Sequence, residues 1–442
     1  MITKMKFLFK LEKIFFYLLV FFLPLQWRLI LGSFNSPFNE WASIYLYATD
    51  ILIAATLILW AWRLFTAKNS GQSAEVNLRA ELYQAAFFVI SALSLAVAGN
   101  LKLGVYSLMK IFEFIVLYLY LKFNFQKLFS LENFWRVFVV SALLQSALAV
   151  AQFFKQKWLG LKILSESPLA PDIDGVAKVV VNGQKFIRAY GLTPHPNILA
   201  AVLVAAIFGL VYLFLKKYRR IDNVRKIIYG FVFALLLFAL CLTFSRAVTV
   251  IGLGLLFLWL ILIFWRVRNL RRPVLIVFFA LLVVGLSLSI LFRAYLFARY
   301  DFGQFGAGQS VNLRVFYNKI AWDIIKQIPL FGVGVGNFVW ATSRLPLLPA
   351  WLYQPVHNIY LLIAAQSGVF ALLAFLIFLF IIIAKSLKKA KTSIGGDGLA
   401  VSCLLFVVFC LLLIGLFDHF LWDQQQGQIL LWTILGTLSS FI

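Results

Sequence analysis

Residues 247–292 have the sequence AVTVIGLGLLFLWLILIFWRVRNLRRPVLIVFFALLVVGLSLSILF, which decides the fold class of this chain. Two apolar runs, 247–265 and 274–292, flank the short basic segment RVRNLRR. A helix needs about 20 mostly apolar residues to cross about 30 Å of hydrocarbon, so each run is long enough to span a membrane. The stretch therefore predicts two membrane helices joined by a basic loop.

The rest of the chain has the same character. Hydrophobic residues make up 63% of its 442 residues and charged residues only 13%, whereas a soluble domain is about one quarter charged. We therefore expect an all-α integral membrane protein, a single polytopic domain over residues 1–442 with about 12 transmembrane helices. The expected spans are 13–31, 43–63, 84–99, 103–121, 135–154, 196–215, 227–244, 247–265, 274–292, 358–384, 399–417 and 428–442.

The large positive charge follows the expected topology. The chain has 40 Lys and Arg against 16 Asp and Glu, a net charge of +24. If all twelve spans cross, the basic runs KKYRRIDNVRK (216–226), RVRNLRR (266–272) and KSLKK (385–389) lie on one side of the membrane. Because basic loops stay in the cytoplasm, we expect both termini to be cytoplasmic. We expect no nucleic-acid partner, since topology accounts for the basic excess.

Two long loops are expected on the outer side. The first, residues 155–195, contains KVVVNGQK (178–185), whose Asn182-Gly183 pair predicts a β-hairpin. The second, residues 293–357, is a large extracytoplasmic loop between helices 9 and 10. Inside it Phe316, Ile320 and Ile324 recur at helical spacing with charged residues opposite them. This pattern predicts an amphipathic helix lying on the outer membrane surface.

Polar residues are concentrated where the outer loops meet the spans. They fall in four segments, Arg188–Asn197, Thr243–Arg246, Asn312–Arg314 and Pro355–Asn358. The forked guanidinium of Arg can bind a phosphate or diphosphate without a metal ion. His is the side chain best suited to exchange a proton near neutral pH. Both are needed when a hydroxyl attacks a sugar whose leaving group is a phosphorylated lipid.

Several of these residues also have simpler interpretations. Arg246 could reach the lipid head groups, although the positive-inside bias disfavours an Arg in a very short outer connection. Arg188 and Arg314 could be solvated loop charges. His195, which lies between two prolines, could shape the start of the sixth span. His419 lies in a short outer turn, where we expect an interfacial role.

His357 is the strongest candidate for a catalytic base. It opens a span at the outer surface, and Asn358 beside it can orient a ring or a substrate hydroxyl. Asp172 and Asp174 have the spacing of a metal-dependent sugar transferase, but their Pro-flanked loop favours turn formation, so we expect no metal. The glycine-rich segment 332–336 follows a helix instead of a strand, and it predicts a tight bend, not a dinucleotide site.

A transporter is the competing class of function. Lys110 and Glu113 are three residues apart in the fourth span, so they share one helix face and are expected to neutralise each other. Together with Asp50 in the second span they could form a proton path. A lipid-linked glycan flippase or another polytopic transporter is therefore the alternative to an enzyme.

The order of the motifs resembles that of one known superfamily. The pattern Arg-x-x-Gly-x-x-x-His-Pro-Asn (188–197) is followed by Thr-x-Ser-Arg (243–246), by Arg314 with PLFGVGVGNF (329–338), and by His-Asn (357–358) with Gly368 after it. This order, the twelve expected spans and the large loop resemble the O-antigen ligase and O-antigen polymerase superfamily along essentially the whole chain. Ala371 and Ala247 depart from the usual pattern, but neither change removes a charged or proton-carrying group.

The resemblance implies a metal-independent, inverting membrane glycosyltransferase without a cofactor. Its donor would be a polyprenyl-diphosphate-linked glycan at the outer face of the cytoplasmic membrane. By motif, Arg188 and Arg246 would bind the donor diphosphate and His357 would be catalytic. Arg314, His195 and Asn358 would be secondary substrate contacts.

The acceptor decides the biological role, and the motifs do not identify it. A lipid A core would make the protein a ligase, another glycan repeat a polymerase, and a protein hydroxyl an O-oligosaccharyltransferase. We expect a glycan or lipid-glycan acceptor, because no extra C-terminal region follows the twelfth span. Membrane lipids are the remaining expected partner.

Overall fold

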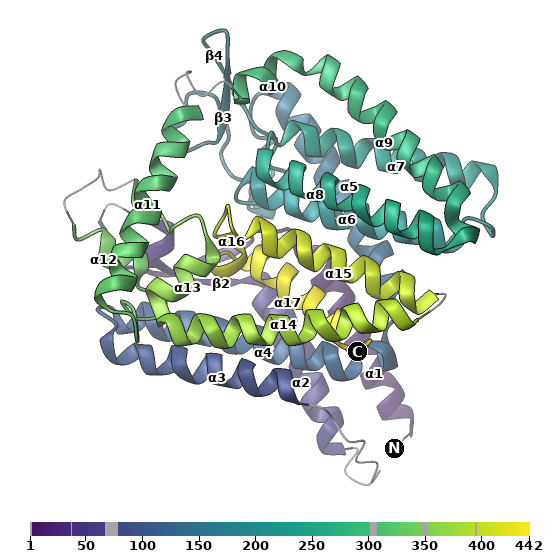
Figure 1. Cartoon of the computed structure of the whole chain (residues 1–442). Coiled ribbons are helices and arrows are strands. Elements are labelled where there is room, and N and C mark those ends of the chain that lie inside the picture. The colour runs from purple at the N-terminus through teal and green to yellow at the C-terminus, as the bar shows by residue number, and fades with distance from the viewer. Residues whose placement is uncertain (1, 37, 67–77, 301–306, 346–351, 394–395) are drawn as a thin grey trace.

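The computed structural model describes residues 2–36, 38–66, 78–300, 307–345, 352–393 and 396–442, and it is mostly helical (Figure 1). Among these residues, ten helices are long and apolar enough to cross a membrane, so the chain is a multi-pass membrane protein. The ten are α2 (Ala48–Thr66), α3 (Arg79–Leu93), α4 (Leu101–Leu128), α5 (Leu131–Lys155), α6 (Pro196–Lys217), α7 (Asn223–Leu242), α8 (Arg246–Arg266), α9 (Arg271–Leu291), α14 (Val369–Thr392) and α15 (Gly396–Ile414).

The remaining elements are shorter or more polar. The helices are α1 (Ile2–Phe22), α10 (Arg293–Tyr300), α11 (Ala307–Gln327), α12 (Phe338–Thr342), α13 (Ile359–Ser367), α16 (Phe420–Asp423) and α17 (Gln425–Ser439). The strands are β1 (Arg28–Ser33), β2 (Ser43–Tyr47), β3 (Lys178–Val181) and β4 (Gln184–Ile187). Helices α1 and α17 match the first and twelfth expected spans, but α1 is rich in charge and α17 has only 15 residues. The count of about 12 spans thus stays a prediction.

Helix α6 lies at the centre of the bundle. Its whole apolar window is buried, and it packs against α5, α7, α8 and α15. Glycines allow these helices to approach closely. A Cβ atom at Gly209 would lie 2.3 Å from the ring of Trp135, and one at Gly252 would lie 2.5 Å from Val204.

The first two expected spans are wrong at their outer ends. Residues 28–33 and 43–47 form the antiparallel pair β1–β2. Helix α1 ends at Phe22 because Pro24 disfavours helical backbone in the residue before it. Tyr45 and Tyr47 are buried on alternate positions of β2, a pattern that suits a strand, and α2 starts only at Ala48.

The tenth expected span is broken at Gly368. This glycine has a φ of 86°, and it separates α13 from α14. A Cβ atom at Gly368 would lie 1.9 Å from the carbonyl oxygen of Leu330, in the segment just before the glycine-rich bend. Within the bend Gly332 and Gly336 also have positive φ angles, so the predicted bend is confirmed.

The local predictions for the two outer loops agree with the structure. Strands β3 and β4 form an antiparallel hairpin in which Val181 pairs with Gln184. Asn182 and Gly183 have φ angles of 49° and 78°, as a two-residue turn with two positive φ angles requires. Helix α11 exposes Lys319 and Lys326 and packs its apolar face inward. Its position on a membrane surface stays a prediction.

The two ends of the bundle differ in composition. At one end Glu132 of α5 pairs with Lys216 and Lys217 at the end of α6, at 3.1 and 2.9 Å. Figure 1 shows the N-terminus and the α8–α9 connection toward this side, whereas α11, α12 and the β3–β4 hairpin lie toward the opposite side. We call these the basic end and the site end.

Candidate functional site

A chain of hydrogen bonds joins two of the polar segments at the site end to Asp418. Nε of Arg188 donates to the carbonyl oxygen of Thr243 at 2.6 Å, and its Nη2 donates to Oδ1 of Asn197 at 2.7 Å. Nδ2 of Asn197 in turn donates to Oδ2 of Asp418 at 2.6 Å. Arg188 is only 4% exposed. It therefore links the start of α6 to the α7–α8 turn and to the segment that follows α15.

His357 and Asp418 form the centre of the site. Nδ1 of His357 lies 3.8 Å from Oδ1 of Asp418, and this buried nitrogen has no hydrogen-bond partner among the described residues. The same Oδ1 accepts a hydrogen bond from the backbone N–H of His419 at 2.8 Å. The ring centroids of His357 and His419 are 4.9 Å apart. A carboxylate held in this way beside an imidazole is the arrangement of a general base and its orienting group.

His419 has a carboxylate partner of its own. Its Nδ1 donates to Oδ1 of Asp423 at 2.8 Å, one helical turn further along the chain. Trp41, from the segment before β2, packs edge-on against the His419 ring with centroids 5.8 Å apart. The structure therefore places two imidazole–carboxylate pairs side by side.

The protonation states of these groups differ. Burial lowers the pKa of His357, so this imidazole is neutral near pH 7. Burial alone would raise the pKa of Asp418, but the adjacent His357 and the other two histidines outweigh it and hold the pKa well below its usual range. Burial also opposes protonation of His419, yet Asp423 raises the pKa of this ring above its ordinary value. A neutral base thus lies beside a permanently ionised carboxylate.

Two of the predicted secondary contacts have clear structural roles. His195 caps α6, because its Nδ1 accepts the backbone N–H of Asn197 at 3.2 Å. Burial, together with the charge of Arg188, lowers the pKa of His195 to about 3. Asn358 caps α13 by accepting the backbone N–H groups of Tyr360 and Leu361. Substrate contacts by His195 and Asn358 stay predictions.

Arg314 lies on α11, on the same side of the site as His357. Its positive charge lies close enough to His357 to oppose protonation of that ring. The Nε atom of Arg314 is buried and has no hydrogen-bond partner within the described ranges. A buried, unpaired donor of this kind is costly unless a ligand supplies an acceptor.

Arg246 lies at the first position of α8, beside the turn that Arg188 holds. Phe244 in this turn has a φ of 46°, a conformation that is rare for a bulky residue and that its packing against Phe153 and Tyr295 maintains. Together with Ser245, Arg246 lines a pocket between α7, α8 and α9. Most of the other lining residues are leucines, namely Leu237, Leu240, Leu253, Leu281, Leu288 and Leu296. The arginine thus stands beside an apolar groove.

The two acidic motifs of the sequence end up in different environments. Asp172 and Asp174 are exposed and lie in turns. Lys110 instead pairs with Asp50 at 2.6 Å and with Glu113 at 3.2 Å, so the expected neutralisation of Lys110 and Glu113 extends to a third residue.

His357, Asp418 and His419 offer ligand atoms that all lie within 4.8 Å of one another, a spacing that one divalent ion could bridge.

Sequence reasoning missed Asp418, Asp423 and the role of His419. The signal was present, since the segment Asp418-His419-Phe-Leu-Trp-Asp423 places two acids around a histidine in a chain with only 16 acids. Its small size and its position in a short turn made it resemble an interfacial segment. Its partner Asn197 is 221 residues away, so the sequence alone did not show the contact.

The fold and the site define a class: a multi-pass membrane protein with histidine, carboxylate and arginine side chains gathered at one end of its bundle. Comparison with known proteins then finds a family match for part of the chain. Residues 231–376, from α7 to α14, match the family described as O-antigen ligase, and this segment includes Arg246, Arg314 and His357. The resemblance in the motifs is confirmed over this segment and indicates glycan transfer. A comparison with curated proteins finds no match to the chain.

Proposed function

We propose that this protein transfers a glycan from a polyprenyl-diphosphate carrier to an acceptor hydroxyl at the outer face of the cytoplasmic membrane. The observation that carries the proposal is the neutral His357 beside the ionised Asp418, with the unpaired Nε of Arg314 nearby. This arrangement supplies a proton acceptor and a cation around one reaction centre.

The proposed reaction is a single displacement. The acceptor oxygen bonds to the anomeric carbon of the donor sugar, the bond from that carbon to the diphosphate oxygen breaks, and the configuration inverts. The hydroxyl proton moves to His357. Because Nδ1 of His357 faces Asp418, the tautomer with the hydrogen on Nδ1 is favoured and Nε2 is left to take the proton. Asp418 then stabilises the imidazolium, as in other imidazole–carboxylate pairs.

The donor lipid fits the groove beside Arg246. Its leucine lining suits an isoprenoid chain, and the start of α8 adds the positive pole of a helix to the guanidinium. We assign Arg246 and Arg314 to the diphosphate, where they would spread the charge that grows on the leaving group. Arg188 is buried behind Asn197 and Asp418. We therefore assign Arg188 to positioning Asn197 and Asp418, and its charge adds to the positive potential of the site.

The proposed orientation follows from the distribution of basic residues. The basic end would face the cytoplasm together with both termini, and the site end would face outward. The unit of residues 293–357 would then be the large outer loop, and residues 155–195 the smaller one. Cysteine accessibility to a membrane-impermeant reagent tests this orientation, and labelling of a cysteine at Lys319 only from the cytoplasmic side would contradict it.

A metal-independent reaction is also part of the proposal. Both Asp418 oxygens already accept hydrogen bonds, and Nδ1 of His419 is bound to Asp423, which leaves a poor ligand set for a cation. Transfer that continues in EDTA would support this assignment. If transfer stops in EDTA and returns when a divalent ion is added, His357, Asp418 and His419 would be assigned as ligands of a metal ion instead.

The experiment is transfer in liposomes from the host's diphosphate-linked glycan to lipid A core, to free glycan and to a Ser- and Thr-containing protein. Product on lipid A core defines a ligase, product on glycan a polymerase, and product on protein an O-oligosaccharyltransferase. The product should disappear in His357→Ala and in Arg246→Ala. Arg225→Ala is the matched control, because this arginine is exposed at the basic end.

The transporter alternative rests on a different cluster. Lys110 pairs with Asp50 and Glu113, and Gln425 also donates a hydrogen bond to Asp50. A fully paired cluster needs no proton path to explain it. If Lys110→Met abolishes movement of a lipid-linked glycan across the membrane while no acceptor ever receives a glycan, the flippase interpretation replaces ours.

A further inference from the structure

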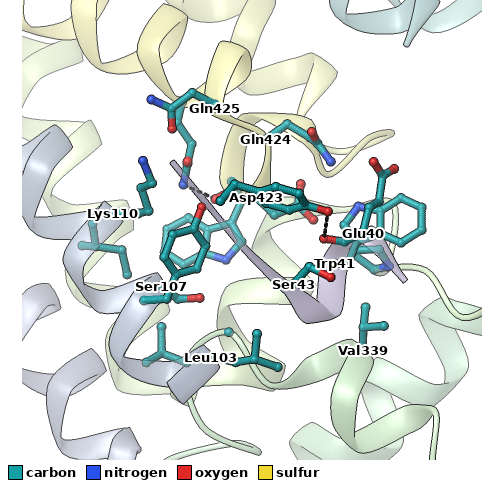
Figure 2. Close-up of a pocket in the computed structure, with 18 of the residues that line it drawn as sticks. Glu40, Trp41, Ser43, Leu103, Ser107, Lys110, Val339, Asp423, Gln424 and Gln425 are labelled. Carbon is teal, nitrogen blue, oxygen red and sulfur yellow. Dashed lines mark hydrogen bonds between the residues drawn. The ribbon is translucent and has the colours of Figure 1, made fainter. Parts of the chain in front are cut away.

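A second polar cavity lies beside the His419–Asp423 pair. Its walls come from the segment 40–47, from α4, from the start of α12 and from the segment 422–428. Figure 2 shows Trp41, Asp423 and Gln424 around this space, with Lys110 and Gln425 on its other side. The cavity is separate from the leucine groove beside Arg246, which α7, α8 and α9 form. Nothing in the proposed donor site uses it.

Aromatic rings and hydrogen-bonding groups alternate around the cavity. Trp41, Tyr45, Tyr106 and Trp422 all line it. The flat faces of such rings pack well against the C–H faces of a sugar, while their polar atoms bond to hydroxyl groups. The same lining contains Ser43, Ser107, Gln366, Gln424, Gln425 and Gln428. This is the composition of a site for a polyhydroxylated ligand.

Three polar atoms in this lining have no hydrogen-bond partner in the part of the chain that the structure describes. They are Oε1 of Gln424, Oδ2 of Asp423 and Nε1 of Trp41, and all three atoms are buried. Gln424 is only 7% exposed. Two acceptors and one donor left unpaired call for a ligand that both donates and accepts hydrogen bonds, as sugar hydroxyls do.

The charges around the cavity favour a neutral ligand over a phosphate. Arg28 is paired with Glu40 at 3.2 Å, and Lys110 is paired with Asp50 and Glu113. Both cations of the lining are therefore neutralised by protein carboxylates. Asp423 is paired with His419 through Oδ1, and its Oδ2 is left as a hydrogen-bond acceptor, which suits a hydroxyl group and not a diphosphate oxygen.

The cavity lies directly against the proposed catalytic centre. Asp423 and Trp41 both contact His419, whose ring is 4.9 Å from that of His357, and Pro355 of the lining is two residues before His357. We propose that this cavity, which we call the acceptor cavity, binds the sugar whose hydroxyl receives the transferred glycan. The inference rests on the proposed function and adds the acceptor's place and chemical class.

The acceptor cavity also has a route from the membrane. It shares Tyr45, Tyr106 and Lys110 with a wide apolar groove between α2 and α4. The groove is lined by outward-facing residues such as Val105, Met109 and Phe112, each at least 41% exposed. A sugar attached to a lipid could therefore reach the cavity sideways, and a free sugar from the outer side. The experiment distinguishes these two sources.

Photo-crosslinking tests the site independently of catalysis. Wild-type protein in liposomes is irradiated with diazirine-bearing N-acetylglucosamine and diazirine-bearing galactose, each as the free sugar and as a lipid glycoside. Adducts in residues 40–47 or 422–428 support the proposal. If the lipid glycoside labels these residues more strongly than the free sugar, the acceptor reaches the cavity from the membrane, and the reverse result indicates entry from the outer side. Adducts confined to residues 237–253, or no site-specific adduct with any probe, overturn it. This result does not depend on whether the protein transfers glycans.

Kinetics test the role of the same residues in transfer. In Gln424→Leu and in Trp41→Phe, which keeps a ring and removes only the indole N–H, the KM for the acceptor should rise about ten-fold. The KM for the donor and the slow release of glycan to water should not change. A fall in both acceptor-dependent and water-dependent rates would contradict the acceptor assignment. Equal melting temperatures for wild type and Trp41→Phe exclude a folding defect.

Discussion

Two charged residues at opposite ends of the helix bundle, Glu12 and Arg314, differ in how they are paired. At the basic end Glu12 of α1 accepts two hydrogen bonds from Arg63 at 3.0 and 3.1 Å and a third from Tyr120 at 2.9 Å. At the site end Nε of Arg314 and Oδ2 of Asp423 are buried without a hydrogen-bond partner among the residues described. Buried polar groups are normally paired, so an unpaired set beside a cavity marks a place where a ligand completes the bonding.

The difference predicts that the two ends respond differently to substitution. Charges that pair within the protein stabilise the arrangement of the helices, and their removal should lower stability without changing the chemistry. Polar groups whose partner is the substrate contribute little to folding stability, and their removal should lower the rate of glycan transfer. Each of the following changes separates these two effects.

The largest effect is expected for His357→Ala. Removing a general base typically costs about 10²–10⁴-fold in rate, and we expect transfer to fall by about 10³-fold. The melting temperature should fall less than in Glu12→Ala, because Nδ1 of His357 makes no hydrogen bond that the substitution would break, although Asp418 loses a favourable neighbour. Initial rates and thermal melts on the same preparation check both statements. A variant that keeps a third or more of the wild-type rate would remove His357 from the mechanism.

Glu12→Ala should affect the opposite property. Glu12 is fully buried, and its loss leaves Arg63 without its carboxylate partner. Breaking a buried ion pair by removing one member costs about 3–5 kcal/mol of unfolding free energy. Denaturation in detergent measures this loss. The rate per folded molecule should stay within a factor of about two, and a rate loss like that of His357→Ala would abolish the distinction between the two ends.

Arg246 tests whether charge alone is enough at the site end. Arg246→Ala should lower transfer by about 10²-fold, the usual cost of losing one preorganised donor to a developing negative charge. Arg246→Lys should also be impaired, because an ammonium is a point charge that does not reproduce the guanidinium fork. Donor-concentration series for both variants make the comparison. Normal transfer by Arg246→Lys would argue against a bidentate contact with the diphosphate.

A smaller effect is expected in the pH dependence of stability. The pKa of His419 is raised in the folded protein, chiefly by Asp423, with Asp418 and Glu40 adding to it. A raised pKa means that the stabilisation is fully present below the unfolded value of about 6.5 and is lost as the pH rises through the folded value. Asp423→Asn should therefore lower the melting temperature more at pH 6 than at pH 9. An equal loss at both pH values would show that the pair does not titrate.

The smallest effect is expected at an exposed pair of the basic end. Arg136 and Glu132 are 3.4 Å apart, but the arginine side chain is 50% exposed. Solvent screens such a pair, so Arg136→Ala should change stability by less than about 1 kcal/mol. The same denaturation assay that is used for Glu12→Ala gives the value. A loss as large as that of Glu12→Ala would mean that burial does not set the strength of these pairs.

Much of the fold could be predicted because its determinants are local. Apolar length predicts the ten candidate spans, and Asn182-Gly183 predicts the β3–β4 turn. The β1–β2 strands were missed because their apolar residues extend the apolar runs of the neighbouring helices, and the few polar residues there, such as Gln26 and Arg28, were too short a break to separate a strand from a span. The break at Gly368 was missed because it depends on a contact with the carbonyl oxygen of Leu330, which the sequence does not show.

The site could be predicted only in part. Arg246, Arg314 and His357 stand out because charged residues are rare in the segments that join the membrane spans on their outer side. The pairing of His357 with Asp418, and the position of Arg188 behind Asn197, come from packing between segments that are distant in the sequence. The capping roles of His195 and Asn358 are local, but the same residue types serve caps and substrate contacts equally well.

The most direct test of the central claim is a single-turnover measurement in liposomes. Wild type, His357→Ala and Glu12→Ala are each loaded with the diphosphate-linked glycan in the presence of EDTA, and product formation on the acceptor is followed after mixing. Our account predicts product from wild type and from folded Glu12→Ala at similar rates, and none from His357→Ala on the same timescale. Equal rates for all three proteins would contradict the assignment of catalysis to the site end.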